Sequence, residues 1–236
     1  MDALKIYIRG SFSSLRETKG MRYQKTYSMP TKTTIIGLAG AALGFRGKAL
    51  EPLFEAFKVS VVQEGRSGFA QDLWSITKPK KNTKTERAVY IRELLYAPTY
   101  SIYFSSTREE ELKKLYVAFS DPVYPLVLGK NDELAIIEKN QLVKLKKAEE
   151  MALYKHTIVP FDYRTKKYEF EKIDLLKGTT IRPPYVVRLP SAFSIADDGI
   201  FRTPMNYIKV SFIENLGIRF KDEPGLTDGT NNFFFW

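Results

Sequence analysis

Leu4-Lys5-Ile6-Tyr7-Ile8-Arg9-Gly10 is the stretch that decides the fold, because its aliphatic residues alternate with residues that carry polar groups. This period of two is typical of a half-buried β-strand, and Gly10 ends it. A long polar segment, 11–30, follows without a sustained apolar period. Thr31 is then placed to cap a helix that runs to Gly44. The chain therefore begins with a strand, a loop and a helix.

Further elements follow outward from this start. Residues 55–62 contain β-branched and aromatic residues and predict a second strand, and 99–105 (TYSIYFS) predict a third. A helix comes next, with apolar residues at helical spacing: Leu112, Leu115, Tyr116 and Phe119. A strand near 134–138 completes the order β-α-β-β-α-β. This order is the ferredoxin-like unit shared by RNA-recognition folds.

The order predicts an α+β chain with two regions. We expect a ferredoxin-like, RNA-recognition-like domain at 1–148 with an insertion at about 63–95, followed by a small β-rich region at 149–236. Beyond residue 150 the pattern changes to short strands separated by Pro and Gly. The apolar ending at 231–236 (NNFFFW) either docks on this chain or meets a partner, and the sequence leaves both interpretations open.

The composition favours a polyanionic partner. Thirty-seven Lys and Arg against 27 Asp and Glu give a formal charge of +10. Much of this excess lies in residues 1–50, which hold nine Lys and Arg against Asp2 and Glu17. The chain has no cysteine and a single histidine, which excludes thiolate and multi-His metal centres, so we expect no cofactor. No apolar run is long enough to span a bilayer, so we expect a cytoplasmic protein without membrane contact.

The loop before the first helix is the first candidate site. Phe12, Tyr23 and Tyr27 alternate there with cations, and Thr31 opens a helix whose free N–H groups can receive a phosphate. The expected RNA-binding residues of this segment are Arg9, Arg16, Lys19, Arg22, Lys25, Tyr27, Thr31 and Lys32. Cations bind phosphates, and aromatic rings stack on unpaired bases. The competing interpretation is a solvated loop whose tyrosines pack on the sheet.

The insertion at about 63–95 is the second candidate site. Its flanks, 69–77 and 87–95, have strand-like residues and predict a two-stranded arm. Its tip gathers further expected RNA-binding residues: Lys78, Lys80, Lys81 and Lys84, with Arg87 just beyond. A basic tip on an isolated hairpin suits phosphate contact. The competing interpretation is an ordinary lysine-rich loop that charge keeps soluble.

Catalytic patterns are weak in this sequence. Lys32-Thr33 resembles the end of a phosphate-binding loop but lacks the glycines of that motif. His156, in Tyr154-Lys155-His156, is the sole residue with an ordinary pKa near neutrality, and a lone histidine beside a strand is commonly structural. Asp197-Asp198-Gly199 is typical of a turn. We expect no catalytic residues.

The quoted segments resemble a known family. They are YSMPTKTTIIGL (27–38), AALG (41–44), RELLYAPTY (92–100) and YPLVLG (124–129), with a looser match at Pro183-Pro184-Tyr185. Together they resemble the Cas-five subunit of type I CRISPR Cascade complexes, a member of the RAMP superfamily. The resemblance covers residues 1 to about 145 in the family's order. The glycine-rich loop of the superfamily's C-terminal part is absent in obvious form.

The resemblance implies a function and partners. It implies a non-catalytic subunit that binds the 5′ handle of the CRISPR guide RNA, with the hairpin at 63–95 as a thumb over that handle. The implied partners are the Cas-seven backbone subunit and the Cas-eight large subunit, in antiviral defence. Two alternatives stay open: a precursor-RNA endoribonuclease of the same superfamily, since one branch uses a Tyr, Lys and His set, and a stand-alone RNA-binding protein.

Overall fold

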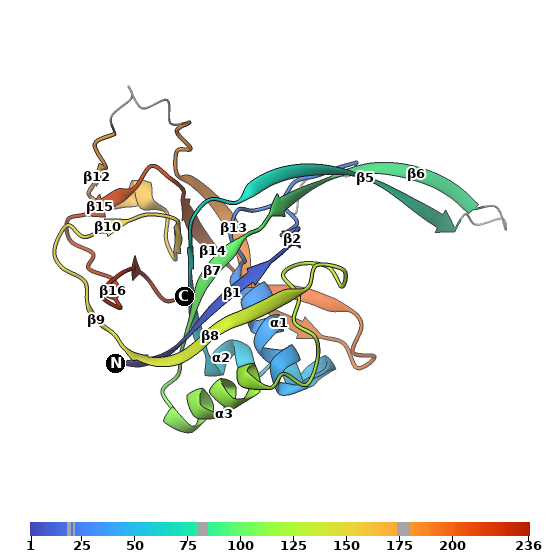
Figure 1. Ribbon diagram of the computed structural model, residues 1–236, viewed down its shortest axis with the longest axis horizontal. Helices are drawn as coiled ribbons and strands as arrows, with labels where there is room; N and C mark the ends of the chain where they lie inside the picture. The colour runs from blue at the N-terminus through green and yellow to red at the C-terminus, as the bar shows by residue number, and fades with distance from the viewer. Residues whose placement is uncertain (18–19, 21, 80–84, 174–179) are drawn as a thin grey trace.

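The computed structural model describes residues 1–17, 20, 22–79, 85–173 and 180–236. The alternating stretch that opens the chain lies in β1 (Asp2–Gly10), where Leu4, Ile6 and Ile8 are fully buried. Lys5 and Tyr7 point to the other face and are partly exposed. The prediction for this strand is confirmed, and the molecule as a whole is a mixed α and β fold dominated by strands (Figure 1).

The main sheet joins the two ends of the chain. Among the described residues it has seven hydrogen-bonded strands, in the order β13 (Tyr185–Ile195), β14 (Arg202–Ile213), β11 (Thr157–Val159), β4 (Lys58–Gln63), β7 (Thr99–Ser105), β1 and β8 (Ala135–Lys144). All the neighbours are antiparallel. Strands from beyond residue 150 therefore extend the sheet of the first region, and the predicted boundary at 148/149 stays a prediction.

The helices cover one face of this sheet (Figure 1). They are α1 (Lys32–Leu43), the short α2 (Leu53–Ala56) and α3 (Glu109–Ser120), with 3-10 turns η1 (Gly47–Leu50) and η2 (Tyr163–Thr165). Ile36 of α1 and Leu115 of α3 are fully buried in one core with the aliphatic residues of β1, β4 and β7. Thr31 and Gly44 flank α1 as predicted, and Gly44 adopts the left-handed conformation (φ 75°) that glycine favours at a helix end.

The insertion forms a long hairpin that extends away from the rest of the molecule (Figure 1). β5 (Gly68–Pro79) pairs antiparallel with β6 (Thr85–Tyr96), with Leu73 opposite Ile91 and Trp74 opposite Tyr90. Both predicted flanking strands lie within these elements. β6 also pairs with β2 (Phe12–Ser13) and β3 (Tyr23–Gln24), so the segment predicted as an irregular loop is tied to the base of the hairpin.

Two smaller sheets lie on the side of the main sheet away from the long hairpin (Figure 1). One contains β10 (Leu153–Tyr154), β15 (Ile218–Phe220) and β12 (Tyr168–Phe170), and the other contains β17 (Asn232–Phe233), β16 (Leu226–Thr227) and β9 (Lys146–Lys147). The first of these sheets contributes Tyr154, Ile218 and Phe220 to a separate aromatic core.

The strand predicted at 55–62 is wrong in its first residues. Pro52 has helical dihedral angles (φ −60°, ψ −24°) and starts α2, so the strand begins only at Lys58. Proline suits this position because its fixed φ matches the first helical turn and its missing N–H has no partner to lose there. The buried Leu53 on α2 packs into the main core, and tertiary packing outweighs the strand propensity of the following residues.

The aromatic ending docks on the chain itself. Phe233 is fully buried, and its ring stacks on Tyr103 with 4.0 Å between the centroids. The backbone N–H and C=O of Trp236 exchange hydrogen bonds with Val59, at 3.0 and 3.1 Å, and its indole lies in the main core. Phe234 packs in the separate aromatic core with Tyr154. The ending therefore connects all three cores of the described structure.

Candidate nucleic-acid interface

The segment between β1 and α1 is folded against the hairpin by Glu93. Its carboxylate accepts hydrogen bonds from the Tyr23 hydroxyl (2.7 Å) and the Thr26 N–H (3.1 Å). Inside the segment, the Tyr27 N–H donates to the Leu15 carbonyl at 2.8 Å. These bonds give a polar, aperiodic stretch of sequence a defined path along β6.

Glu133 joins three segments at the base of the hairpin. Its buried carboxylate accepts hydrogen bonds from the Ser14 N–H (2.6 Å), the Lys130 N–H (3.0 Å) and the Arg92 guanidinium (3.2 Å). Arg92 is itself buried and also pairs with Asp72 at 2.9 Å. Breaking a buried pair costs about 3–5 kcal/mol because it leaves an uncompensated charge. The N-terminal segment, the hairpin and the turn at 128–133 are therefore held in one arrangement.

Gly129 is required at this junction. Its φ of 134° lies in the region that favours glycine, and a Cβ there would collide with the Glu133 carboxylate and the Ser14 backbone. This explains why a glycine ends the YPLVLG segment.

A groove of about 980 Å³ runs over α1 beside this junction. The exposed side of α1, with Thr34, Gly37 and Ala41, forms part of its lining, and no side chain fills the space above Gly37. Among the described residues, four cations line the groove: Arg16, Arg46, Lys130 and Arg202. The lining formed by the described residues contains no Asp or Glu. The groove therefore combines a small-residue floor with a positive rim.

The cations of the groove are available to an anion. Lys130 and Arg46 lie over aromatic rings, with Lys130 Nζ 3.2 Å from the centroid of Trp74 and Arg46 Cζ 4.5 Å from that of Tyr124. Burial, followed by the charge of Arg92, lowers the pKa of Lys130, and the opposing charges of Glu133 and Asp132 do not reverse this shift. A phosphate placed between these cations would relieve their repulsion.

Two of the expected binding residues, Arg16 and Thr31, line the groove. Arg16 is exposed on the lining, and Thr31 lies at the start of α1. The Thr31 hydroxyl contacts the hydroxyls of Thr33 and Thr34 and makes no capping bond to the backbone, so α1 begins on the groove without a side-chain cap. Helix N-termini of this kind bind anions.

Tyr27 departs from the expectation. Its side chain borders the groove but is only 5% exposed, and its ring stacks on Phe212 with 5.2 Å between the centroids. The ring packs in the main core, so it is not free to stack on a base as we expected. For Tyr27 the competing interpretation holds, in which the tyrosine packs on the sheet.

The remaining expected residues are dispersed. Lys32 is buried, its pKa is lowered by burial and then by Lys58, and it does not line the groove. Arg9 pairs with Glu138 at 2.5 Å on β8. Exposed cations at Arg22, Lys25 and Arg87 lie along the hairpin and the segment attached to it. Lys19, Lys80, Lys81, Lys84 and the side chain of Lys78 lie outside the described residues, so their assignment stays a prediction.

Sequence reasoning missed Arg46, Lys130, Arg202 and Tyr124. Lys130 directly follows the YPLVLG segment, and Arg46 lies two residues after Gly44, which ends the AALG segment, so proximity to quoted motifs was an available signal for both. Arg202 lies on a strand of the C-terminal region and carries no such signal.

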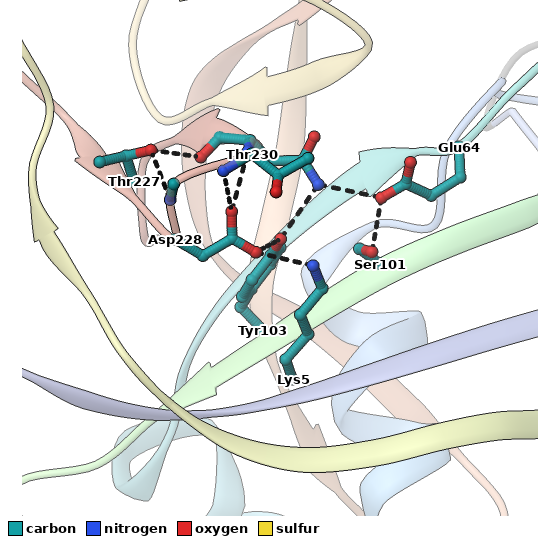
Figure 2. Close-up of polar contacts among 9 residues, drawn as sticks. Lys5, Glu64, Ser101, Tyr103, Thr227, Asp228 and Thr230 are labelled. Carbon is teal, nitrogen blue, oxygen red and sulfur yellow. Dashed lines mark hydrogen bonds and ion pairs between the residues drawn. The ribbon is translucent and has the colours of Figure 1, made fainter.

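The opposite face of the sheet holds a second, mixed cleft. It has about 440 Å³ and is lined by Lys5, Tyr7, Glu64, Glu138 and Lys139 among others. Figure 2 shows the polar contacts beside it, where Asp228 accepts hydrogen bonds from Lys5 and Tyr103. The carboxylates make this cleft a poorer match for phosphates than the groove over α1.

The Tyr154-Lys155-His156 set is engaged in structural contacts. The buried Tyr154 hydroxyl accepts a hydrogen bond from the Gly225 N–H at 2.6 Å, and Lys155 pairs with Glu171 at 2.8 Å. His156 has a left-handed backbone (φ 54°), and burial, followed by the charge of Lys155, lowers its pKa. Its backbone groups bond to Gln63 and Glu214, which ties β11 to its neighbours.

No helix in the described part of the chain is long and apolar enough to cross a membrane.

Comparisons with known proteins point in one direction. A family model described as CRISPR-associated protein (Cas_Cas5) matches residues 3–171. A solved chain from a "CRISPR RNA-guided surveillance complex" is similar over 93% of this chain and 91% of its own, at 16% identity and a TM-score of 0.53. A CRISPR protein from Archaeoglobus fulgidus is similar over 98% of both chains, at 10% identity and a TM-score of 0.55. These two likenesses show a shared fold. None of the curated proteins compared with the chain matches it.

Proposed function

This chain belongs to the CRISPR-associated protein (Cas_Cas5) family, and from that premise we propose that it binds the 5′ handle of a CRISPR guide RNA. The observation that carries the proposal is the groove over α1, where four cations surround a small-residue floor and the described lining has no carboxylate. Single-stranded RNA binds to such grooves because cations follow its phosphates. The uncapped N-terminus of α1 adds an anion site at one end.

We infer that the chain is built on a ferredoxin-like unit with a thumb. The strand order β8-β1-β7-β4, with α1 between β1 and β4 and α3 between β7 and β8, supports this inference. The β5–β6 hairpin is the proposed thumb, and the Glu133 junction fixes its base beside the groove.

The proposed role is that of a subunit in a Cascade surveillance complex for antiviral defence in the cytoplasm. Its proposed partners are the Cas-seven backbone subunit and the Cas-eight large subunit. Family membership supports this assembly role, and the net charge of +10 suits a chain that contacts RNA within it.

We also propose that the subunit does not cut RNA. General acid–base catalysis requires a titratable group within hydrogen-bond reach of the substrate. Tyr154 and Lys155 are both engaged in other bonds, and His156 is half-buried beside them, which supports a structural role for the set.

RNA binding is tested by the salt dependence of affinity. We expect the variant Arg16→Ala/Arg46→Ala/Arg202→Ala to bind cognate guide RNA more weakly, with a log–log salt slope reduced by about 0.7 for each phosphate that is no longer bound. The matched control removes three exposed cations outside the groove, Lys114, Lys144 and Lys172, and should keep both slope and affinity. Equal effects of the two triple variants on labelled-RNA anisotropy would reject the groove as the binding site.

Cleavage is tested with labelled cognate CRISPR-repeat RNA. We expect the purified protein to leave this RNA intact. Site-specific cutting that disappears in His156→Ala, with an unchanged melting temperature, would overturn the non-catalytic assignment.

A further inference from the structure

Trp74 lies where the hairpin meets the groove. It belongs to β5, opposite Tyr90 of β6. Its ring is contacted by Arg92, which lies on β6, and by Lys130, which lies outside the hairpin. Lys130 Nζ lies 3.2 Å from the ring centroid, and Arg92 Cζ lies 5.4 Å from it. Because Lys130 also lines the groove, the indole stands at the groove's end beside the hairpin.

In the described part of the chain, the Lys130 ammonium contacts the Trp74 ring and not a carboxylate. Among the described residues, no Asp or Glu oxygen lies within ion-pair distance of its Nζ. The neighbouring Glu133 and Asp132 carboxylates are engaged by Arg92 instead, at 3.2 and 3.6 Å. The ammonium is therefore held by the ring face, in a neighbourhood that also contains Arg16 and Arg92.

An unpaired nucleotide supplies a better partner for both groups. Its base offers a flat π face to the indole, and its phosphate offers an anion to the ammonium. We propose that Trp74 is a stacking platform for one unpaired RNA base, and that Lys130 covers the ring in the RNA-free protein and binds the adjacent phosphate when the base arrives. This inference rests on the proposed RNA-binding function and assigns a nucleotide position within it.

The arrangement explains two features of the junction together. The Arg92–Glu133 pair holds β6 against the turn that carries Lys130, so the indole and the ammonium are kept in register. The hairpin also places the ring beside the positive end of the groove, while the part of the groove over α1 is formed by the small residues Thr34, Gly37 and Ala41.

Tryptophan fluorescence provides a direct test, because the chain has two tryptophans and Trp236 is buried in the core. Single-stranded RNA of cognate repeat sequence is titrated while the anisotropy of a label on the RNA reports binding independently. We expect the emission of the wild-type protein to be quenched along the binding isotherm. Trp74→Phe, which leaves Trp236 as the only tryptophan, should bind RNA with little loss of affinity and show no quenching.

Two substitutions measure the energetic role. Trp74→Leu should weaken RNA binding roughly 5- to 150-fold, which is the 1–3 kcal/mol range for removal of one stacked base. Lys130→Met should reduce the salt slope by about 0.7 and change the emission of the RNA-free protein. The control is Tyr96→Leu, an exposed aromatic of the same strand pair, which should stay within about twofold of wild type.

The outcomes separate this inference from the function on which it rests. Normal RNA binding by anisotropy, with unchanged Trp74 emission and no loss of affinity in Trp74→Leu, overturns the stacking platform and leaves the groove assignment standing. Absence of RNA binding by the wild-type protein overturns both. Because the quenching is measured on the unsubstituted protein, misfolding of a variant does not obscure the result.

Discussion

Asp228 is the residue on which the polar contacts of the helix-free face converge (Figure 2). Burial by itself raises its pKa, but hydrogen bonds, from the Asn231 N–H (2.8 Å) and Lys5 (2.7 Å) among others, outweigh burial and lower it to about 2. A carboxylate with a lowered pKa stabilises the fold above its ordinary pKa, and this contribution is lost as the pH falls through the folded-state value. We expect the free energy of unfolding to fall by about 2 kcal/mol between about pH 4 and pH 2 as this contribution is lost.

Urea unfolding across this pH range checks the prediction. Asp228→Asn should lower the free energy of unfolding at pH 7 by about 2 kcal/mol and should remove this component of the acid-induced loss of stability. The control is Glu138→Gln, which removes the more exposed pair with Arg9 and should cost less than about 1 kcal/mol. Parallel pH curves for Asp228→Asn and wild type would contradict the assignment.

Helix α1 carries two glycines three residues apart with opposite surroundings. A Cβ on Gly37 would meet no atom within 4 Å, whereas a Cβ on Gly40 would lie 2.0 Å from Leu50 Cδ2. Alanine is favoured over glycine inside a helix by about 1 kcal/mol. We therefore expect Gly37→Ala to stabilise the protein by up to about 1 kcal/mol, and Gly40→Ala to destabilise it by about 1–3 kcal/mol through overpacking.

The two alanine variants control each other, because they make the same change in the same helix. The urea concentrations at which they are half unfolded should move in opposite directions, and the m-value should stay the same. Shifts of the same sign would show that packing against Leu50 does not decide the cost. The structure places the Leu50 side chain against Gly40 and the open groove above Gly37.

At the scale of the whole molecule, the aromatic ending joins cores that the topology otherwise keeps apart. Phe233 and Trp236 are both buried, in two different cores, and truncating a buried large aromatic side chain costs about 3–5 kcal/mol. Since domains are stable by only about 5–15 kcal/mol, a variant lacking residues 233–236 should fail to unfold cooperatively. Phe233→Ala alone should lower the free energy of unfolding by about 3–5 kcal/mol.

Circular dichroism during urea unfolding of the isolated protein checks this prediction. The exposed Phe201, at 72% exposure, is the matched control, and Phe201→Ala should change stability by less than about 0.5 kcal/mol. If the shortened chain unfolded like wild type, the ending would belong to a partner's surface instead of this chain's core.

Periodicity predicted the parts of the fold that depend on local pattern. The alternation at 4–9 identified a buried strand face, and Thr31 and Gly44 marked the two ends of the first helix, because such signals are local in sequence. The strand at 55–57 failed because Pro52 and the packing of Leu53 outweighed local propensity. Two of the expected contact residues, Arg16 and Thr31, line the groove, and the competing packing role holds for Tyr27.

What the sequence by itself determined is therefore the kind of chain: a basic α+β protein whose segments at 27–44, 92–100 and 124–129 resemble one family. The tertiary structure alone decided which side chains meet. Arg16, Arg46, Lys130 and Arg202 are far apart in sequence and line one groove only because the sheet order brings their elements together. Burial of Tyr27 and docking of residues 233–236 were likewise decided by tertiary packing, because a local pattern specifies that a face is apolar but not which partner covers it.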